Sequence, residues 1–139
     1  MPNDYYTMIF TGEKMDELLS RRILQPMRFR EAAWSRDPQQ YPIGATGLYI
    51  SAEDMVKLGA LYLQDGVYDG QRLLSSEWVR LALAREYEFH SVTANGLIGK
   101  GGMYGQGLYF SPQHGFAIAW HAHQPDGRAK LIAYADTLS

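Results

Sequence analysis

Apolar residues recur at helical spacing near both ends of the chain. Between Thr11 and Leu24 an apolar stripe is followed by Pro26, so the pattern predicts a helix that stops at this proline. The residues of that stripe are Met15, Leu18, Leu19 and Ile23. A second stripe predicts a helix from Arg128 to Leu138. Its apolar side holds Leu131, Ile132, Ala135 and Leu138.

Two serines mark the starts of the middle helices. Ser51 precedes two acids, which suit the first turn of a helix, and Gly66 is suited to end that helix as its C-cap. Ser75 can cap the next helix, whose apolar residues are Trp78, Val79, Ala82 and Leu83. Between the two, Asp69-Gly70 predicts a tight turn.

Extended segments are fewer. Met103 to Phe110 and Phe116 to His121 flank a loop rich in turn residues and predict a β-hairpin. Leu48 to Ile50 is a short extended run, whereas residues 28–47 read as an irregular connection and the glycine-rich residues 86–102 give no clear prediction. We expect one α+β domain over residues 1–139, with helices packed on a small antiparallel sheet.

Composition narrows the functional classes. The chain has 139 residues, 46% of them hydrophobic and 20% charged, with a net charge of −2 and no basic run, so we expect no nucleic-acid partner. No apolar stretch approaches the ~18 residues of a membrane span, and the N-terminus has no signal-peptide pattern. We expect a soluble protein of unknown compartment. Cysteine is absent, which excludes disulfides and thiolate nucleophiles, and no cofactor is indicated.

The features between Gly44 and Ser75 agree in order and spacing. A glycine-rich loop precedes the Ser51 helix start, and the Asp69-Gly70 turn leads to Leu73-Leu74-Ser75. This pattern resembles serine hydrolases of the class C β-lactamase and penicillin-binding protein type, which include DD-peptidases and esterases. With residues 18–27, Gly102–Gln106 and Pro112, the resemblance spans roughly residues 3–121. It implies a β-lactamase/transpeptidase-like fragment, the C-terminal part of such a fold.

The resemblance also implies three catalytic motifs. The first is Ser-x-x-Lys, which places a nucleophile and its base one helical turn apart. No serine in this chain is followed three residues later by lysine. The second is Tyr-x-Asn, of which Asn3 is the candidate remnant, with Met1 where the tyrosine belongs. The chain would then start inside this motif, with the nucleophile-bearing part missing upstream.

The third motif is Lys/His-x-Gly on a strand, where the cation binds the substrate carboxylate. By the alignment of strands, Met103-Tyr104-Gly105 takes its place, and a methionine cannot bind a carboxylate. Lys100-Gly101-Gly102 fits the literal pattern one step earlier, and Lys100 is either a substrate cation or a solvated lysine. Tyr104 either lines a former pocket or packs sideways on its strand. We identify no catalytic residue in this chain.

Three functions are compatible with these observations. The first is a truncated serine hydrolase domain, inactive alone, whose intact relatives act on β-lactams, peptidoglycan peptides or small esters through an acyl-serine. The second is a non-catalytic module that forms homo-oligomers through an exposed sheet edge. The third, less favoured, is a metal-dependent enzyme using His121 and His123. Since a metal site needs about three or four ligands, we expect no metal there.

Overall fold

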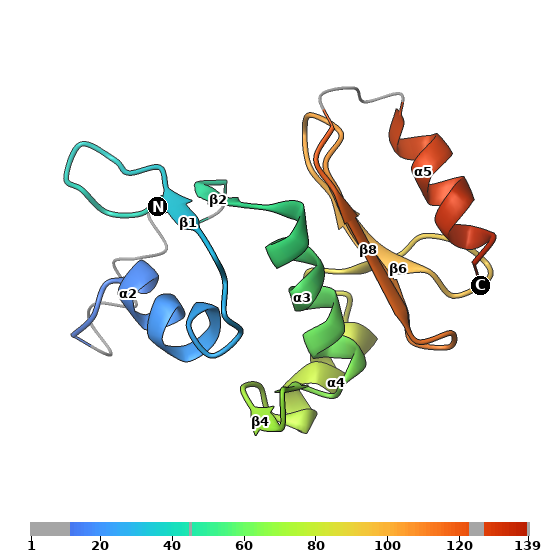
Figure 1. Cartoon of the computed structure of the whole chain (residues 1–139), viewed down its shortest axis with the longest axis horizontal. Coiled ribbons are helices and arrows are strands. Elements are labelled where there is room, and N and C mark those ends of the chain that lie inside the picture. The colour runs from blue at the N-terminus through green and yellow to red at the C-terminus, as the bar shows by residue number, and fades with distance from the viewer. Residues whose placement is uncertain (1–11, 45, 123–126, 139) are drawn as a thin grey trace. The chain divides into compact units, whose positions relative to one another are not determined.

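The computed structural model describes residues 12–44, 46–122 and 127–138. It shows helices and small antiparallel sheets, so the predicted α+β class is confirmed (Figure 1). The chain forms two compact units, Met1–Ser51 and Ala52–Ser139. Among the residues that the structure describes, no helix combines the length and the apolar character that crossing a bilayer requires.

The first described helix of unit 1 is α2 (Met15–Leu19), which continues as a π-helical turn, η1 (Ser20–Leu24). The predicted helix therefore starts later than expected, and its second half is wider than an α-helix, with the N–H of Gln25 bonded to the carbonyl of Ser20 at 2.9 Å. The wider turn buries Leu24, a residue outside the predicted stripe. The helix ends just before Pro26, as predicted.

The connection in unit 1 is more ordered than the sequence indicated. Strand β1 (Ala32–Trp34) lies within the segment predicted to be irregular, and it pairs antiparallel with β2 (Leu48–Ile50). The prediction missed β1 because three residues are too few to show alternation. The turn expected at Asp37 is present, since its carboxylate accepts the N–H groups of Gln39 and Tyr41, both at 2.9 Å.

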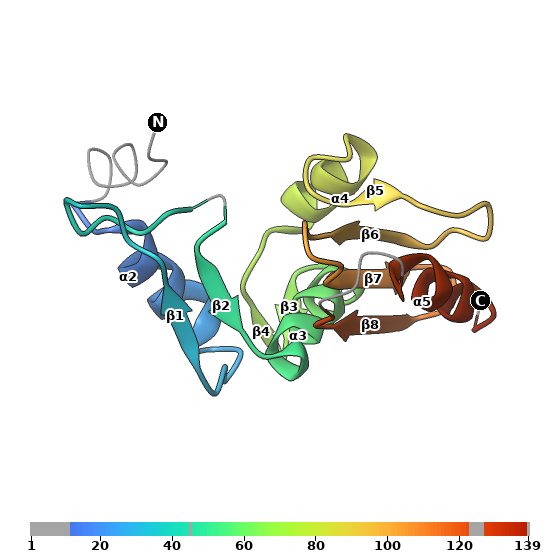
Figure 2. The same cartoon turned by 90° about the horizontal axis from the view of Figure 1, so that it is seen from above.

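Unit 2 contains a four-stranded antiparallel sheet in the order β5-β6-β7-β8 (Figure 2). The strands are β5 (His90–Ser91), β6 (Ile98–Gly101), β7 (Gly107–Ser111) and β8 (Phe116–Trp120). The predicted hairpin is confirmed as β7 and β8. However, its first strand begins at Gly107 rather than Met103, and the glycine-rich segment that gave no prediction supplies β5 and β6.

The first helix of unit 2, α3 (Ala52–Leu63), ends in a left-handed turn one residue earlier than expected. Asp65, with φ +54°, occupies the position that glycine usually takes, and the N–H of Gly66 bonds to the carbonyl of Leu61 at 2.8 Å. Gly66 is also left-handed, with φ +81°, and a Cβ there would lie 2.3 Å from the carbonyl oxygen of Leu74. Glycine is therefore needed at position 66 for both reasons.

Two local predictions beside the middle helices, the Asp69-Gly70 turn and the Ser75 cap, are confirmed. Strands β3 (Val67–Tyr68) and β4 (Gln71–Arg72) are joined by Asp69 and Gly70, both with positive φ, as the tightest hairpin turn requires. Helix α4 (Ser76–Ala84) is capped by the Ser75 hydroxyl, which accepts the N–H of Trp78 at 3.1 Å.

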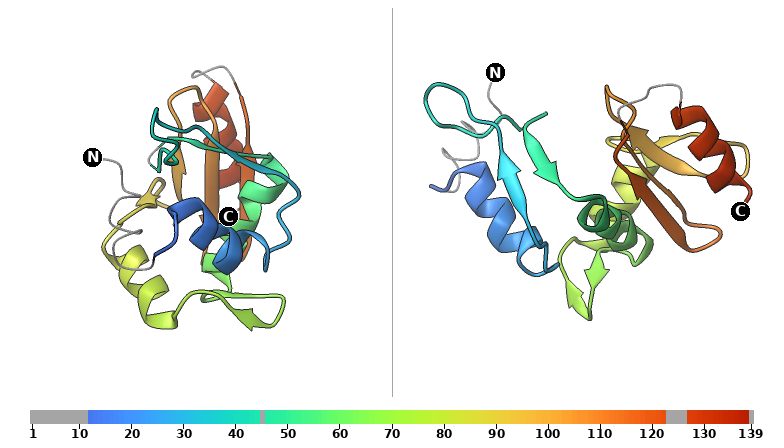
Figure 3. Two further views of the ribbon diagram at one scale, coloured as in Figure 1. Left: turned by 90° about the vertical axis from the view of Figure 1, so that its left-hand side faces the viewer. Right: turned by 45° about the horizontal axis from the view of Figure 1, so that its top comes forward.

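The sheet of unit 2 is covered on both faces (Figure 3). Helix α3 lies against β7 and β8, and its Gly59 approaches so closely that a Cβ there would sit 3.0 Å from that of Ala117. Helix α5 (Gly127–Asp136) covers the other face. The core beneath α5 comprises Leu97, Tyr109, Trp120 and Ala135.

Replacing Gly66 by alanine should destabilise the protein more than replacing Gly70. Both residues have positive φ, which costs an alanine roughly 1–2 kcal/mol. At Gly70 a Cβ meets nothing within 4 Å, whereas at Gly66 it collides with the backbone of Leu74. We expect the free energy of unfolding in urea to fall further for Gly66→Ala, and equal losses would contradict this account.

Candidate functional site

The predicted site residues fall on one hairpin of unit 2. Lys100 lies on β6, while Met103, Tyr104 and Gly105 form the turn that joins β6 to β7. We call residues 102–106 the β6–β7 turn. These four residues lie in one short segment of the structure. Asn3, the fifth predicted site residue, lies outside the described residues.

Backbone hydrogen bonds hold the β6–β7 turn in a tight conformation. The N–H of Gly102 donates to the carbonyl of Gln106 at 2.8 Å, and that of Gly105 to Gly102 at 3.2 Å. Gly105 is buried with φ +99°, and its carbonyl accepts the indole N–H of Trp120 at 2.7 Å. The turn is therefore fixed from the core side by a buried aromatic residue of β8.

The side chains at the tip of this turn face solvent. Met103 is 80% exposed and Tyr104 is 58% exposed. The N–H of Tyr104 is bonded to the side-chain carbonyl of Gln106 at 3.0 Å, so its backbone belongs to the turn rather than to a strand. Met103, predicted from the sequence to take the place of the cation of the third motif, is thus an exposed thioether on a turn.

Lys100 is the cation of β6, and it is already paired. Its Nζ lies 2.5 Å from a carboxylate oxygen of Glu88, and both side chains are more than half exposed. Such a surface pair contributes little to stability and leaves the amine hydrated. Because side chains alternate along a strand, Lys100 projects to the face opposite the one that Gly99 and Gly101 present.

Arg128, at the start of α5, is a charged residue that contacts the turn and was not singled out from the sequence. Its guanidinium donates to the carbonyl of Gly102 and covers Gly101, where a Cβ would lie 2.7 Å from the guanidinium carbon. The buried Nε of Arg128 has no hydrogen-bond partner among the described residues. Only a contact between residues 26 positions apart reveals this arginine, so no local pattern could have found it.

The glycines around the turn serve close packing rather than phosphate binding. Tyr109 and Trp120 stack with ring centroids 5.0 Å apart and planes 11° from parallel. A Cβ at Gly99 would lie 2.2 Å from the Tyr109 ring, and one at Gly107 would lie 2.5 Å from the Trp120 ring. The rings rest directly on the backbone, which only glycine permits.

A serine–histidine contact at the next hairpin was also missed. The hydroxyl of Ser111 lies 3.1 Å from Nδ1 of His114 and accepts the N–H of His114 at 3.2 Å. Ser111 is fully buried, and the two residues are three apart in one tight turn. This is the geometry of a side chain that closes a turn, and a buried hydroxyl is out of reach of a substrate. The spacing Ser-Pro-x-His was the available signal.

No group of three or more potential ligands could hold a metal ion in the described part of the chain. His121 belongs to that part, and His123 lies outside it.

Almost the whole chain matches a known protein family. The family model described as Beta-lactamase matches residues 9–138. The chain belongs to the Beta-lactamase family. This confirms the resemblance identified in the sequence, and the β6–β7 turn is therefore a feature of a β-lactamase-family chain.

A solved structure shows the same fold. It is described as "Putative 6-aminohexanoate-dimer hydrolase from Bacillus anthracis", superposes with a TM-score of 0.82 and is 22% identical in sequence. The match covers 97% of this β-lactamase-family chain and 40% of that one, so this chain spans less than half of its solved relative. No curated protein matches.

Ser111→Ala should destabilise this β-lactamase-family chain by about 1 kcal/mol, because the half-buried hydrogen bond from the N–H of His114 to the Ser111 hydroxyl is lost. Ser76→Ala is a matched control, since the Ser76 hydroxyl bonds to Asp65 at the surface, where water can replace it. We expect that control to change the free energy of unfolding by less than about 0.5 kcal/mol. A Ser111→Ala protein as stable as the control would contradict the turn-closing role.

Stability should also depend on Tyr109 at alkaline pH. Burial raises the pKa of Tyr109 above its usual value of 10.0, while the charge of Arg128 partly opposes the rise. As pH rises, Tyr109 therefore ionises in the unfolded state before it ionises in the folded state. The stability gained from the neutral phenol is complete below about pH 10 and is lost as pH rises through the pKa of the folded state.

Tyr109→Phe tests this dependence because it keeps the ring over Gly99 and removes the hydroxyl. The difference in free energy of unfolding between wild type and Tyr109→Phe should be constant below pH 10. Above pH 10 the wild type should lose stability relative to the variant. The half-exposed Tyr87 provides the control substitution. A difference that stays flat up to pH 11.5, roughly one and a half units above the model-peptide value, would contradict the prediction.

Proposed function

We propose that this chain is a serine-hydrolase-family domain portion that is catalytically inactive by itself. The proposal rests on what acyl transfer requires chemically. Acyl transfer needs a nucleophile that is accessible and held beside a base. The sequence contains no Ser-x-x-Lys, and the hydroxyl of Ser111, which lies beside the exposed His114, is fully buried.

The candidate substrate-facing part of the chain is the β6–β7 turn. Met103 supplies no charge at its tip, and Lys100 is engaged by Glu88 on the opposite face. Gly105 has its carbonyl occupied by Trp120. A turn of this kind offers shape, backbone and the exposed phenol of Tyr104 to a substrate, without a nucleophile held beside a base.

Activity in this proposal requires a nucleophile from a further segment of protein. The resemblance implies that intact relatives act on β-lactams, peptidoglycan peptides or small esters through an acyl-serine. The solved relative is named as a hydrolase of a 6-aminohexanoate dimer, and its chain is much longer than the part matched here. Asn3 would then contribute an amide to a site that the other segment completes.

The test is turnover by the purified chain. Incubated with a chromogenic β-lactam and with p-nitrophenyl acetate, the protein should release product no faster than a heat-denatured sample. Intact-mass spectrometry after treatment with a fluorophosphonate should show no covalent adduct. Saturable turnover, or an adduct mapped to a defined serine, would overturn the proposal. If an adduct formed, Ser111→Ala would show whether the buried serine had reacted.

A further inference from the structure

The loop between β5 and β6 contains an Asn-Gly pair, and we call residues 92–97 the β5–β6 loop. The chain has two asparagines, Asn3 and Asn95, and of these Asn95 alone precedes a glycine. In an Asn-Gly pair the backbone nitrogen of the glycine can attack the side-chain carbonyl carbon of the asparagine, because glycine has no Cβ to obstruct the approach. The loop therefore carries an amide that can react with its own backbone.

The conformation of the β5–β6 loop restrains this pair only weakly. Asn95 is exposed, and Gly96 is left-handed, with φ +87°. The N–H of Gly96 donates to the carbonyl of Thr93 at 3.2 Å, which is the long end of the range for such bonds. Water therefore reaches the amide, and the attacking nitrogen needs to break only one long hydrogen bond.

Asn95 helps to tie the β5–β6 loop to the end of helix α5. Its Nδ2 donates to Oδ2 of Asp136 at 3.0 Å, and the hydroxyl of Thr93 donates to Oδ1 of the same carboxylate at 2.5 Å. That hydroxyl also accepts the N–H of Leu97 at 3.3 Å, and Leu97 is fully buried in the core together with Ala135. One carboxylate thus receives two donors from the loop, beside the core that lies under α5.

The carboxylate of Asp136 depends on these donors because of its position in the helix. Asp136 is the last residue of α5, where the unpaired carbonyl groups carry partial negative charge, and the last turn contains no basic residue. A carboxylate is disfavoured at that end of a helix unless donors compensate it. An acid in place of the Asn95 amide would remove one donor and set a second negative charge at hydrogen-bond distance from the first, so the two would repel.

We propose that Asn95 deamidates spontaneously and that the product releases the β5–β6 loop from the end of α5. The backbone nitrogen of Gly96 forms a bond to Cγ of Asn95, and its proton passes through water to the side-chain nitrogen, which leaves as ammonia. Water then opens the resulting succinimide at either carbonyl and gives aspartate or isoaspartate. One water is consumed and one ammonia is released, with no oxidant or reductant. This proposal is independent of catalytic activity.

Peptide mass spectrometry of the full chain tests the chemistry. After incubation at mildly alkaline pH, the proteolytic peptide that contains Asn95 should show the mass increase of an amide converted to an acid, as separable aspartate and isoaspartate forms. The peptide that contains Asn3, which precedes an aspartate, is the internal control and should change severalfold more slowly. Equal rates at the two asparagines, or an Asn95 peptide that stays unchanged, would overturn the proposal.

Hydrogen exchange tests the structural consequence. Asn95→Asp reproduces the aspartate product and should speed amide exchange severalfold in the β5–β6 loop and in the last turn of α5, while β7 stays unchanged. Asn95→Ala removes the hydrogen bond without adding a charge, so its effect should be smaller. Asp136→Asn, added to Asn95→Asp, leaves a single carboxylate and should restore slow exchange. The aged wild-type chain should exchange like Asn95→Asp.

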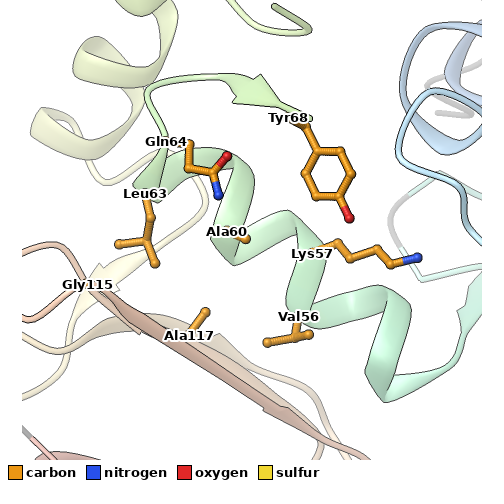
Figure 4. A pocket seen from close by; sticks show the side chains of 8 residues that line it. All are labelled: Val56, Lys57, Ala60, Leu63, Gln64, Tyr68, Gly115 and Ala117. Carbon is orange, nitrogen blue, oxygen red and sulfur yellow. The ribbon is translucent and has the colours of Figure 1, made fainter. Parts of the chain in front are cut away.

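A matched control makes the same chemical change at another surface of unit 2. Gln64 is exposed and lines a groove of about 410 Å³ between α3 and β8 (Figure 4). Gln64→Glu converts an amide to an acid there and should leave exchange in the β5–β6 loop as in the wild type. The proposal fails if Asn95→Asp exchanges no faster than Asn95→Ala, or if Asp136→Asn does not rescue it, because charge repulsion would then have no effect.

Discussion

Unit 2 depends on the close approach of bulky groups to a sheet made locally of small residues. On one face, the stacked rings of Tyr109 and Trp120 rest on the backbone at Gly99 and Gly107. On the other, α3 comes near enough for Gly59 to contact Ala117. Dispersion forces act only at such short range, so the missing side chains are what allow the two layers to pack on the sheet. The same packing positions the β6–β7 turn, because Trp120 also holds the carbonyl of Gly105.

Features encoded by neighbouring residues could be predicted from the sequence. The Ser75 cap and the Asp69-Gly70 turn depend on local backbone geometry, and both are present. Strand β6 could not be predicted, because its glycines carry no hydrophobic pattern and Gly99 is specified by the Tyr109 ring that lies on it. Strand β5 could not be predicted because two residues are too few to show a pattern. The start of β7 was misplaced for a related reason: Met103 and Tyr104 are typical strand residues, but hydrogen bonds within the turn determine their conformation.

The residues of the candidate site also differ in whether a local sequence pattern could identify them. The alignment of strands with the family pattern singled out Met103 to Gly105 as pocket remnants, which stays a prediction, whereas the family itself is confirmed. Arg128 was missed because its contact with Gly102 joins residues distant in sequence. The Ser111–His114 contact was overlooked although it is local. Because Ser111 is buried, the contact closes a turn and is out of reach of a substrate. The presence of a family's fold is therefore separate from the presence of its chemistry, since the first depends on packing and the second on a few exposed groups.

The π-helical turn η1 has a consequence for how unit 1 tolerates changes in length. Its hydrogen bonds span five residues where an α-helix spans four, so Ser20–Leu24 accommodates one residue more than regular geometry would. That surplus residue rotates the following side chains by about 100° relative to an unbroken helix. Leu24 and Met27, at and just after this turn, are buried. The burial of the end of this helix is thus set by a count of residues, and deleting one residue from Ser20–Leu24 would make the helix regular while leaving the following side chains on the same face.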